Sequence, residues 1–120
     1  MSLVPEPTIL PPTVVAAHLE SCAAELDRTP RTELGEIVAV LRHLVAAQRH
    51  LSGTLTGLAD RFGAARRGAL AALPPAETAA LVEILQVAGA AFGYSADALG
   101  ESEPLAEWVA AAAGERTRLP

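Results

Sequence analysis

The chain has 120 residues, a formal net charge of −5 at pH 7 and a single cysteine, and about half of its residues are hydrophobic. This length fits one domain, and the negative charge disfavours a protein that mainly binds nucleic acid, because phosphate binding draws on clustered positive charge. One cysteine excludes an internal disulfide, and the N-terminus has no basic segment followed by an apolar run, so we expect a cytoplasmic protein. All nine basic residues are arginine, which is typical of a GC-rich genome and leads us to expect a bacterial source.

The first part of the chain predicts an arm followed by a helix. Residues 1–12 contain four prolines, so we expect an extended arm. Thr13 can cap a helix that runs to about Asp27, with an apolar stripe formed by Val15, Leu19, Cys22 and Leu26. Thr29 followed by Pro30 then predicts the start of the next helix. Because this connection is very short, we expect the two helices to be antiparallel neighbours.

One long helix, over about residues 30–67, is the predicted centre of the fold. From Leu34 to Ala65 the apolar residues recur at alternating spacings of three and four, with Leu34, Leu41, Gln48, Leu55 and Phe62 at heptad position a and Ile37, Leu44, Leu51, Leu58 and Ala65 at position d. Ser52 to Gly57 contains mostly poor helix formers, and two separate helices are the alternative. Because the heptad phase continues through this segment, we predict one continuous helix. Val38 and Val45 at position e widen the stripe, which indicates packing from two sides.

The C-terminal half predicts two more helices. Pro74 and Pro75 end the long helix and open the next one, which we expect to run to about Phe92, with Gly93 as its stop and a loop from Tyr94 to Glu103. A last helix begins near Ser102, presents Leu105, Trp108 and Val109, and ends at Gly114. Residues 79–94 are apolar around most of the helix, so we expect burial on several sides, partly by another subunit, and no membrane anchor.

The predicted fold class is therefore all-α, a bundle of about four helices around one long central helix. A single helical domain over residues 13–114 would lie between the arm and a loose tail over residues 115–120. The expected core and interface seam consists of Leu34, Ile37, Leu41, Leu44, Gln48, Leu51, Leu55, Leu58, Phe62, Leu81, Leu85 and Phe92. Gln48 is the polar residue among the a positions, and it either fixes the register of the seam or lies where the seam opens to solvent.

Arg42, His43, Arg49 and His50 form a possible basic ridge on the long helix. The ridge could hold an acidic segment or phosphate, but pairing with the acidic C-terminal half or simple solvation is the more ordinary interpretation. The two histidines lie two helical turns apart, about 10 Å, which is too far for one metal ion. Protonation of these histidines at low pH would strengthen the ridge without creating a site.

The sequence predicts no catalytic residues, no metal and no cofactor. His18 and Cys22 have metal-ligand spacing on one helical face, but Cys22 also continues an apolar stripe, so we expect a buried structural thiol. Glu83 lies among apolar residues, and the alternatives for it are burial with a raised pKa or a place on the exposed strip beside Gln86.

We therefore predict a non-enzymatic helical interaction or adaptor protein that acts as a homodimer and presents a surface to a protein partner. One alternative is a ligand-responsive regulatory or sensor protein with an apolar pocket near Phe92, Tyr94 and Trp108. A second alternative is a metal-dependent enzyme that uses His18, Cys22 and Glu83.

Overall fold

The computed structural model describes residues 10–30, 33–68 and 73–118, and its elements are four α-helices. They are α1 (Pro12–Arg28), α2 (Leu34–Arg67), α3 (Pro75–Gly100) and α4 (Ser102–Arg118), and no strand occurs in these residues. The predicted all-α class is confirmed. The chain divides into two compact units, Met1–Arg31 and Thr32–Pro120. The single helical domain over residues 13–114 and the bundle of four helices around α2 stay predictions, and residues 1–9 of the expected arm lie outside the described residues.

Within its described residues, 10–30, the first unit contains α1 alone. The helix begins at Pro12 after Pro11, without a side-chain cap, so the predicted cap at Thr13 is wrong. Its C-terminus is closed by the Thr29 hydroxyl, which donates to the carbonyl oxygen of Glu25 at 2.7 Å. Thr29 therefore ends a helix and does not start the next one. No residue of α1 is buried, and Cys22 is exposed, so the predicted buried thiol is wrong for this unit, which offers no second element to cover the apolar stripe.

The long helix α2 is continuous from Leu34 to Arg67, as predicted, although it begins after Glu33 and not at Pro30. The weak segment stays helical, and two of its hydroxyls bond the carbonyl oxygens one turn earlier. Thr54 Oγ1 donates to the carbonyl oxygen of His50 at 2.9 Å, and Thr56 Oγ1 donates to that of Ser52 at 3.0 Å. With 34 residues the helix is about 51 Å long, at 1.5 Å per residue.

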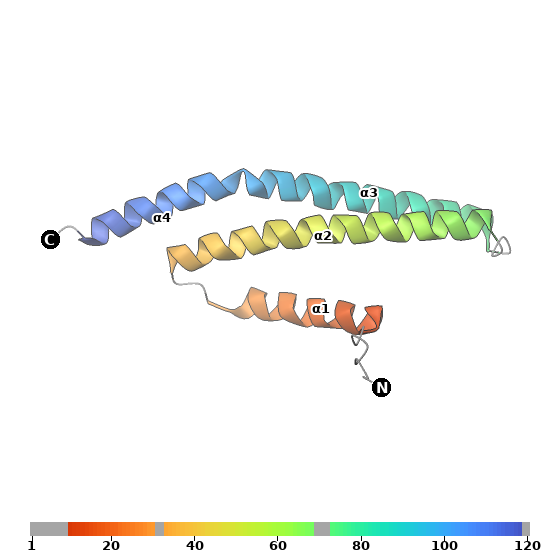
Figure 1. The fold of residues 1–120 in the computed structure, drawn as a ribbon, viewed down its shortest axis with the longest axis horizontal. Coiled ribbons are helices and arrows are strands. Elements are labelled where there is room, and N and C mark those ends of the chain that lie inside the picture. The colour runs from red at the N-terminus through yellow and green to blue at the C-terminus, as the bar shows by residue number, and fades with distance from the viewer. Residues whose placement is uncertain (1–9, 31–32, 69–72, 119–120) are drawn as a thin grey trace, which may run out of the picture. The chain divides into compact units, whose positions relative to one another are not determined.

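The second unit is an antiparallel hairpin of α2 and α3, which α4 continues along the N-terminal part of α2 (Figure 1). The α2 residues that face α3 or α4 repeat every seven residues at heptad position e, and they are Val38, which lies against α4, and Val45, Ser52 and Ala59. Val38, Val45 and Ala59 are buried, and Ser52 is partly buried. The contact with α3 is therefore centred on position e, whereas the sequence placed the seam at positions a and d.

The start of α3 agrees with the sequence, but its end does not. Pro75 is the first residue, and the buried Thr78 holds the turn through its hydroxyl, which donates to the carbonyl oxygen of Pro74 at 2.7 Å. The helix then passes through Gly93 to Gly100, so the predicted stop at Gly93 and the loop from Tyr94 to Glu103 are wrong.

The glycines of α3 allow close packing instead. A Cβ atom at Gly89 would lie 3.0 Å from Thr56 Oγ1 and 3.3 Å from the carbonyl oxygen of Ser52, and one at Gly93 would lie 3.4 Å from Ser52 Oγ. No glycine of the described residues adopts the positive φ that commonly ends a helix. The poor helix formers of α2 and α3 therefore meet at the same level of the hairpin, where small side chains bring the two backbones together.

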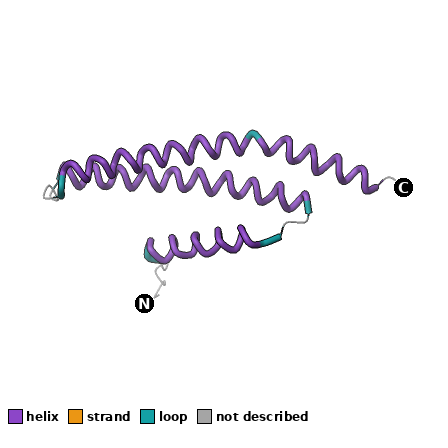
Figure 2. The backbone as a smooth tube through the Cα atoms, turned by 180° about the vertical axis from the view of Figure 1, so that it is seen from behind, coloured by secondary structure: helices purple, strands orange, loops and turns teal. Residues whose placement is uncertain are grey.

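Only Glu101 separates α3 from α4 (Figure 2). Pro104 has no N–H for the carbonyl oxygen of Gly100. At the same junction the Ser102 hydroxyl donates to the carbonyl oxygen of Leu99 at 2.5 Å. The helical path is interrupted here for one residue and then resumes. Because α4 reaches Arg118, the predicted end at Gly114 is wrong, and residues 115–118 of the predicted tail are helical.

Candidate functional site

One side of the hairpin is apolar and only half covered. Because position e of α2 faces α3, positions a and d lie together on one side of the contact. This side, which we call the hairpin face, contains all twelve residues of the predicted seam, from Leu34 to Phe62 on α2 and Leu81, Leu85 and Phe92 on α3. Five of them are 36% to 40% exposed, namely Leu34, Leu58, Phe62, Leu81 and Phe92. Among the described residues no large side chain is fully buried, so the second unit has an open core.

Gln48 lies within this apolar side and is paired across it. Its Nε2 donates to Ser95 Oγ on α3 at 2.9 Å. Its Oε1 is buried and has no hydrogen-bond partner. Gln48 is therefore packed into the hairpin and not fully solvated, and it carries an unmet hydrogen-bonding demand.

The opposite side of the hairpin is polar. Arg49 Nη1 lies 2.9 Å from Asp97 Oδ1 on α3, and Arg42 pairs with Glu107 on α4. All four side chains are about half exposed or more, so each pair contributes at most about 1 kcal/mol to stability. Both arginines of the predicted basic ridge thus engage the acidic half of the chain.

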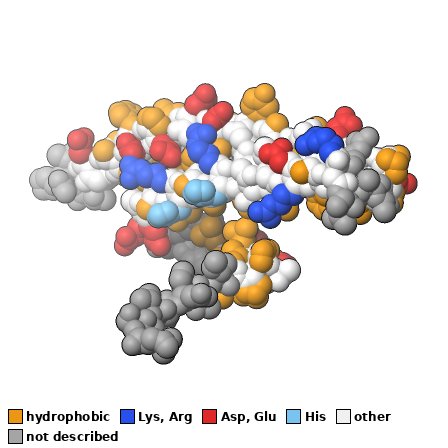
Figure 3. All heavy atoms as spheres, turned by 45° about the vertical axis from the view of Figure 1, so that its right-hand side comes forward, with side chains coloured by type: hydrophobic (Ala, Val, Ile, Leu, Met, Phe, Trp, Pro, Cys, Tyr) orange, Lys and Arg blue, Asp and Glu red, His pale blue; other side chains and the backbone are white. Residues whose placement is uncertain are grey.

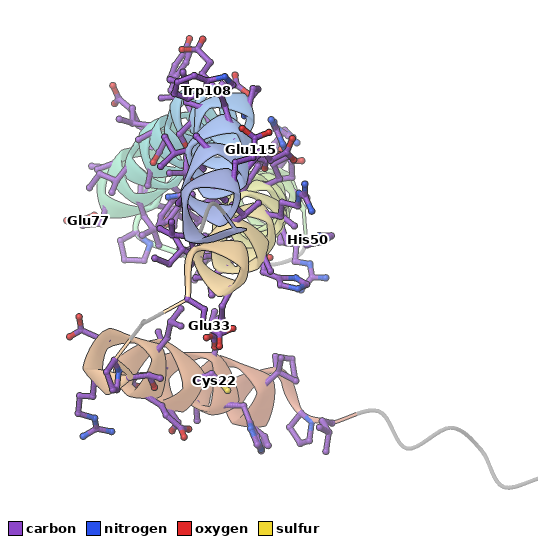
Figure 4. All side chains as sticks on the ribbon, turned by 90° about the vertical axis from the view of Figure 1, so that its left-hand side faces the viewer. Cys22, Glu33, His50, Glu77, Trp108 and Glu115 are labelled. Carbon is purple, nitrogen blue, oxygen red and sulfur yellow. The ribbon has the colours of Figure 1, made fainter. Side chains whose placement is uncertain are left out.

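The histidines of the ridge, His43 and His50, are exposed, and Figure 4 shows His50 pointing outward from α2. Toward the C-terminal end of α2, a hollow of about 470 Å³ lies over Gly53 and Gly57, with Arg49, His50 and Arg61 at its rim. All of its lining residues belong to α2. The ridge is therefore a helix surface with a shallow depression, and it forms no enclosed binding site in the described residues.

A second apolar surface lies on the side of α3 opposite the one that contacts α2, and it continues onto α4, where Leu105 also borders a hollow between α2 and α4. Its large side chains are 63% to 76% exposed and follow one another at heptad spacing, and they are Ile84, Val87, Tyr94, Leu105 and Trp108. We call this set the outer stripe. Hydrophobic side chains stand out along the upper edge of the unit in Figure 3, and Trp108 points away from α2 in Figure 4. In the single chain α2 covers one side of residues 79–94 only, so the expected burial of the other sides by another subunit stays a prediction.

The outer stripe is not apparent from the sequence when residues 94–103 are predicted to form a loop. That loop would have separated Tyr94 from Leu105 and broken the heptad spacing. Read as one helix, residues 84, 87, 91, 94, 98, 101, 105 and 108 alternate in steps of three and four, and only Glu101 is not apolar. This heptad spacing is the sequence signal from which the outer stripe could have been predicted.

The predicted pocket near Phe92, Tyr94 and Trp108 is not enclosed. Tyr94 and Trp108 are mostly exposed on the outer stripe, whereas Phe92 belongs to the hairpin face. An apolar hollow of about 320 Å³ lies instead between α2 and α4, where its lining residues are Leu34, Ile37, Val38, Ser102, Leu105, Ala106 and Val109.

The residues considered for metal chemistry are exposed. His18 and Cys22 lie on α1, and Glu83 lies on the exposed part of α3 beside Gln86. Across residues 10–30, 33–68 and 73–118, no three or more His, Cys, Asp or Glu side chains gather where they could hold a metal ion.

The stretch from Pro75 to Glu115, which includes α3 and α4, is long and apolar enough to cross a membrane by length and composition alone. This property does not assign the chain to a membrane. Comparison with protein-family models, with curated proteins and with solved structures finds no match.

Proposed function

We propose that the protein is a non-enzymatic, cytoplasmic interaction protein that functions as a homodimer through its hairpin face. Two hairpins would pack with these faces together and form a four-helix bundle, in which α2 is the long central helix of each subunit. The observation that carries this proposal is the open core of the second unit: a two-helix layer leaves the a and d positions of α2 partly exposed, none of them buried.

The hairpin face fits a second copy because it is long, broad and almost free of charge. Its residues are Leu, Ile and Phe apart from Gln48, and they extend over most of α2. Burial of apolar surface of this kind would stabilise a dimer by about 25 cal/mol per Å² removed from water. The ion pairs of Arg42 and Arg49 lie on the other side, so two copies could meet without separating them.

Light scattering across a concentration series tests this proposal. We expect a mass twice the chain mass of 12.4 kDa, and a species of 12.4 kDa at every concentration contradicts the proposal. Leu58→Glu combined with Leu81→Glu should weaken the dimer, because both side chains are partly exposed on the hairpin face. Ala46→Glu is the matched control, since Ala46 is exposed at heptad position f on a different side of α2. Circular dichroism verifies that all variants stay helical.

A second candidate, the ligand-responsive regulatory protein, is supported by the apolar hollow between α2 and α4. Its volume of about 320 Å³ lies at the lower end of the range of small-molecule sites. Native mass spectrometry of the purified protein tests it. A co-purified apolar molecule that Val38→Trp displaces would favour this function over the interaction protein.

A further inference from the structure

Each large apolar side chain of the outer stripe has a higher exposed fraction than those of the hairpin face. The stripe also lies on a different side of α3. Gly89 and Ala96 are buried where α3 contacts α2, and the stripe residues of α3, Ile84, Val87 and Tyr94, are offset from them by about half a turn. The dimer proposed above therefore leaves this surface free. Ala91 and Ala98 separate the large residues along the stripe, so a second helix can approach closely between them.

The area is sufficient for a specific but weak contact. At about 200 Å² for an aromatic and about 100 Å² for an aliphatic side chain, the two aromatic and three aliphatic side chains amount to about 700 Å² when fully accessible. Because they are 63% to 76% exposed, they would bury on the order of 500 Å² from this chain. With an equal contribution from the partner, the total is about 1,000 Å², at the lower limit for a specific interface. A helix pairing along the stripe would meet this limit without any contact elsewhere.

Charge decides which kind of helix fits. Glu83 and Asp97 flank the stripe at heptad position g, and Glu101 lies within it, and all three are exposed. Residues 75–115 contain no Lys or Arg that could neutralise them on this helix. Asp97 is paired with Arg49, whereas no ion pair is formed by Glu83 or Glu101 in the described residues. A second copy of the stripe would bring acid against acid, and an anionic lipid surface would be repelled.

We propose that the outer stripe binds an amphipathic helix of a partner protein that carries arginine or lysine beside its apolar face. The partner's apolar residues would pack on Val87, Tyr94 and Trp108, and its basic residues would pair with Glu83 and Glu101. This inference uses a different surface from the homodimer, so the two can fail independently.

Three synthetic peptides of about four heptads test this proposal. The first has leucine at positions a and d and arginine or lysine at e and g. The second has the same leucines with glutamate at e and g, and the third has the composition of the first with its leucines scattered. Trp108 is the sole tryptophan of the chain and lies on the stripe, so its fluorescence reports binding directly.

We expect the basic amphipathic peptide to shift the Trp108 emission to shorter wavelength with a micromolar Kd, and the other two peptides to bind at least tenfold more weakly. Ile84→Gln with Val87→Gln should weaken binding of the basic peptide at least tenfold, while Ala46→Gln on α2 should leave it unchanged. Glu83→Arg with Glu101→Arg should reverse the preference in favour of the acidic peptide. Circular dichroism confirms that each variant is folded before titration.

Several results would overturn the proposal. Equal binding of the scattered basic peptide would show that charge alone is responsible, and an unchanged preference after the charge reversal would show that the partner chemistry is wrong. A Trp108 shift that appears on raising the protein concentration alone assigns the stripe to a second copy. A shift caused by vesicles with anionic lipid assigns it to a membrane.

Discussion

The Ser52 hydroxyl of α2 donates a hydrogen bond of 2.7 Å to the carbonyl oxygen of Gly89 on α3. This bond joins a hydroxyl to the backbone of a neighbouring helix, which is possible because Gly89 has no side chain to hold the helices apart. The segment of α2 that looks weakest in helix propensity is thus where α2 bonds directly to the backbone of α3. The helix stability that this segment loses through its poor helix formers is offset by the tertiary contact between α2 and α3.

Gly89→Ala should lower the free energy of unfolding by about 1–3 kcal/mol, because the new Cβ would lie 3.0 Å from Thr56 Oγ1 and 3.3 Å from the carbonyl oxygen of Ser52. Gly53→Ala is the matched control within the same hairpin. Its Cβ would meet nothing within 4 Å, so it should stabilise the protein by up to about 1 kcal/mol through helix propensity. Urea denaturation followed by circular dichroism measures both. Equal effects of the two substitutions would contradict the close approach at Gly89.

Gln48→Leu should raise the free energy of unfolding by about 1 kcal/mol, because it removes the buried Oε1 that has no partner and adds apolar surface to the hairpin face. Ser95→Ala provides the contrast. It removes the acceptor of the Gln48 Nε2 hydrogen bond and should destabilise by about 1 kcal/mol. Thermal denaturation distinguishes them by the sign of the change. If Gln48 also fixes the register, light scattering should show a broader distribution of oligomers for Gln48→Leu alone.

Asp97→Asn should change the free energy of unfolding by less than about 1 kcal/mol, because both members of its ion pair with Arg49 are more than half exposed. A double-mutant cycle with Arg49→Gln measures the coupling energy, which should decrease as salt is added. A coupling energy well above 1 kcal/mol, unaffected by salt, would mean that the pair is shielded from solvent, for example by a second subunit.

Treatment with EDTA should leave the melting temperature unchanged, because no group of three or more metal ligands forms in the described residues. A metal that binds the native state stabilises it by linkage, so removing such a metal would lower the melting temperature. Elemental analysis of the untreated protein is the companion measurement. A stoichiometric metal together with a lowered melting temperature would return His18 and Cys22 to consideration.

The features that the sequence predicted correctly depend on local signals or on long regular patterns. Pro75 opens α3 because a proline suits the first turn of a helix whatever surrounds it. The heptad phase of α2 predicted a continuous helix through Ser52 to Gly57, since a loop would have reset the phase. Position e could not be identified as the centre of the α3 contact, because a stripe that includes a, d and e looks the same whether α3 lies at one edge or in the middle.

The features that the sequence predicted incorrectly depend on tertiary packing. Gly93 and Gly114 were interpreted as helix stops, yet a glycine inside a helix and a glycine after its end have the same sequence signature. What distinguishes Gly93 is Ser52, forty-one residues earlier in the chain, which lies against it. The error at Gly93 then hid the outer stripe, so the most exposed apolar surface of the second unit became visible only with the helix in place.

The antiparallel hairpin also determines the order in which its parts can assemble. Contacts near the connection between α2 and α3 join residues close in sequence, and contacts toward the far end join residues increasingly distant: 37 positions separate Ser52 from Gly89, 47 separate Gln48 from Ser95, and 65 separate Arg42 from Glu107. The entropy of closing a loop grows with its length, so folding should proceed like a zipper from the connection outward. During synthesis, α2 leaves the ribosome before α3, so the contact between the two helices can form only after α3 has emerged. The helix α4 packs last. Within the second unit, the same order reversed should make α4 the first helix to detach and to be cut by a protease.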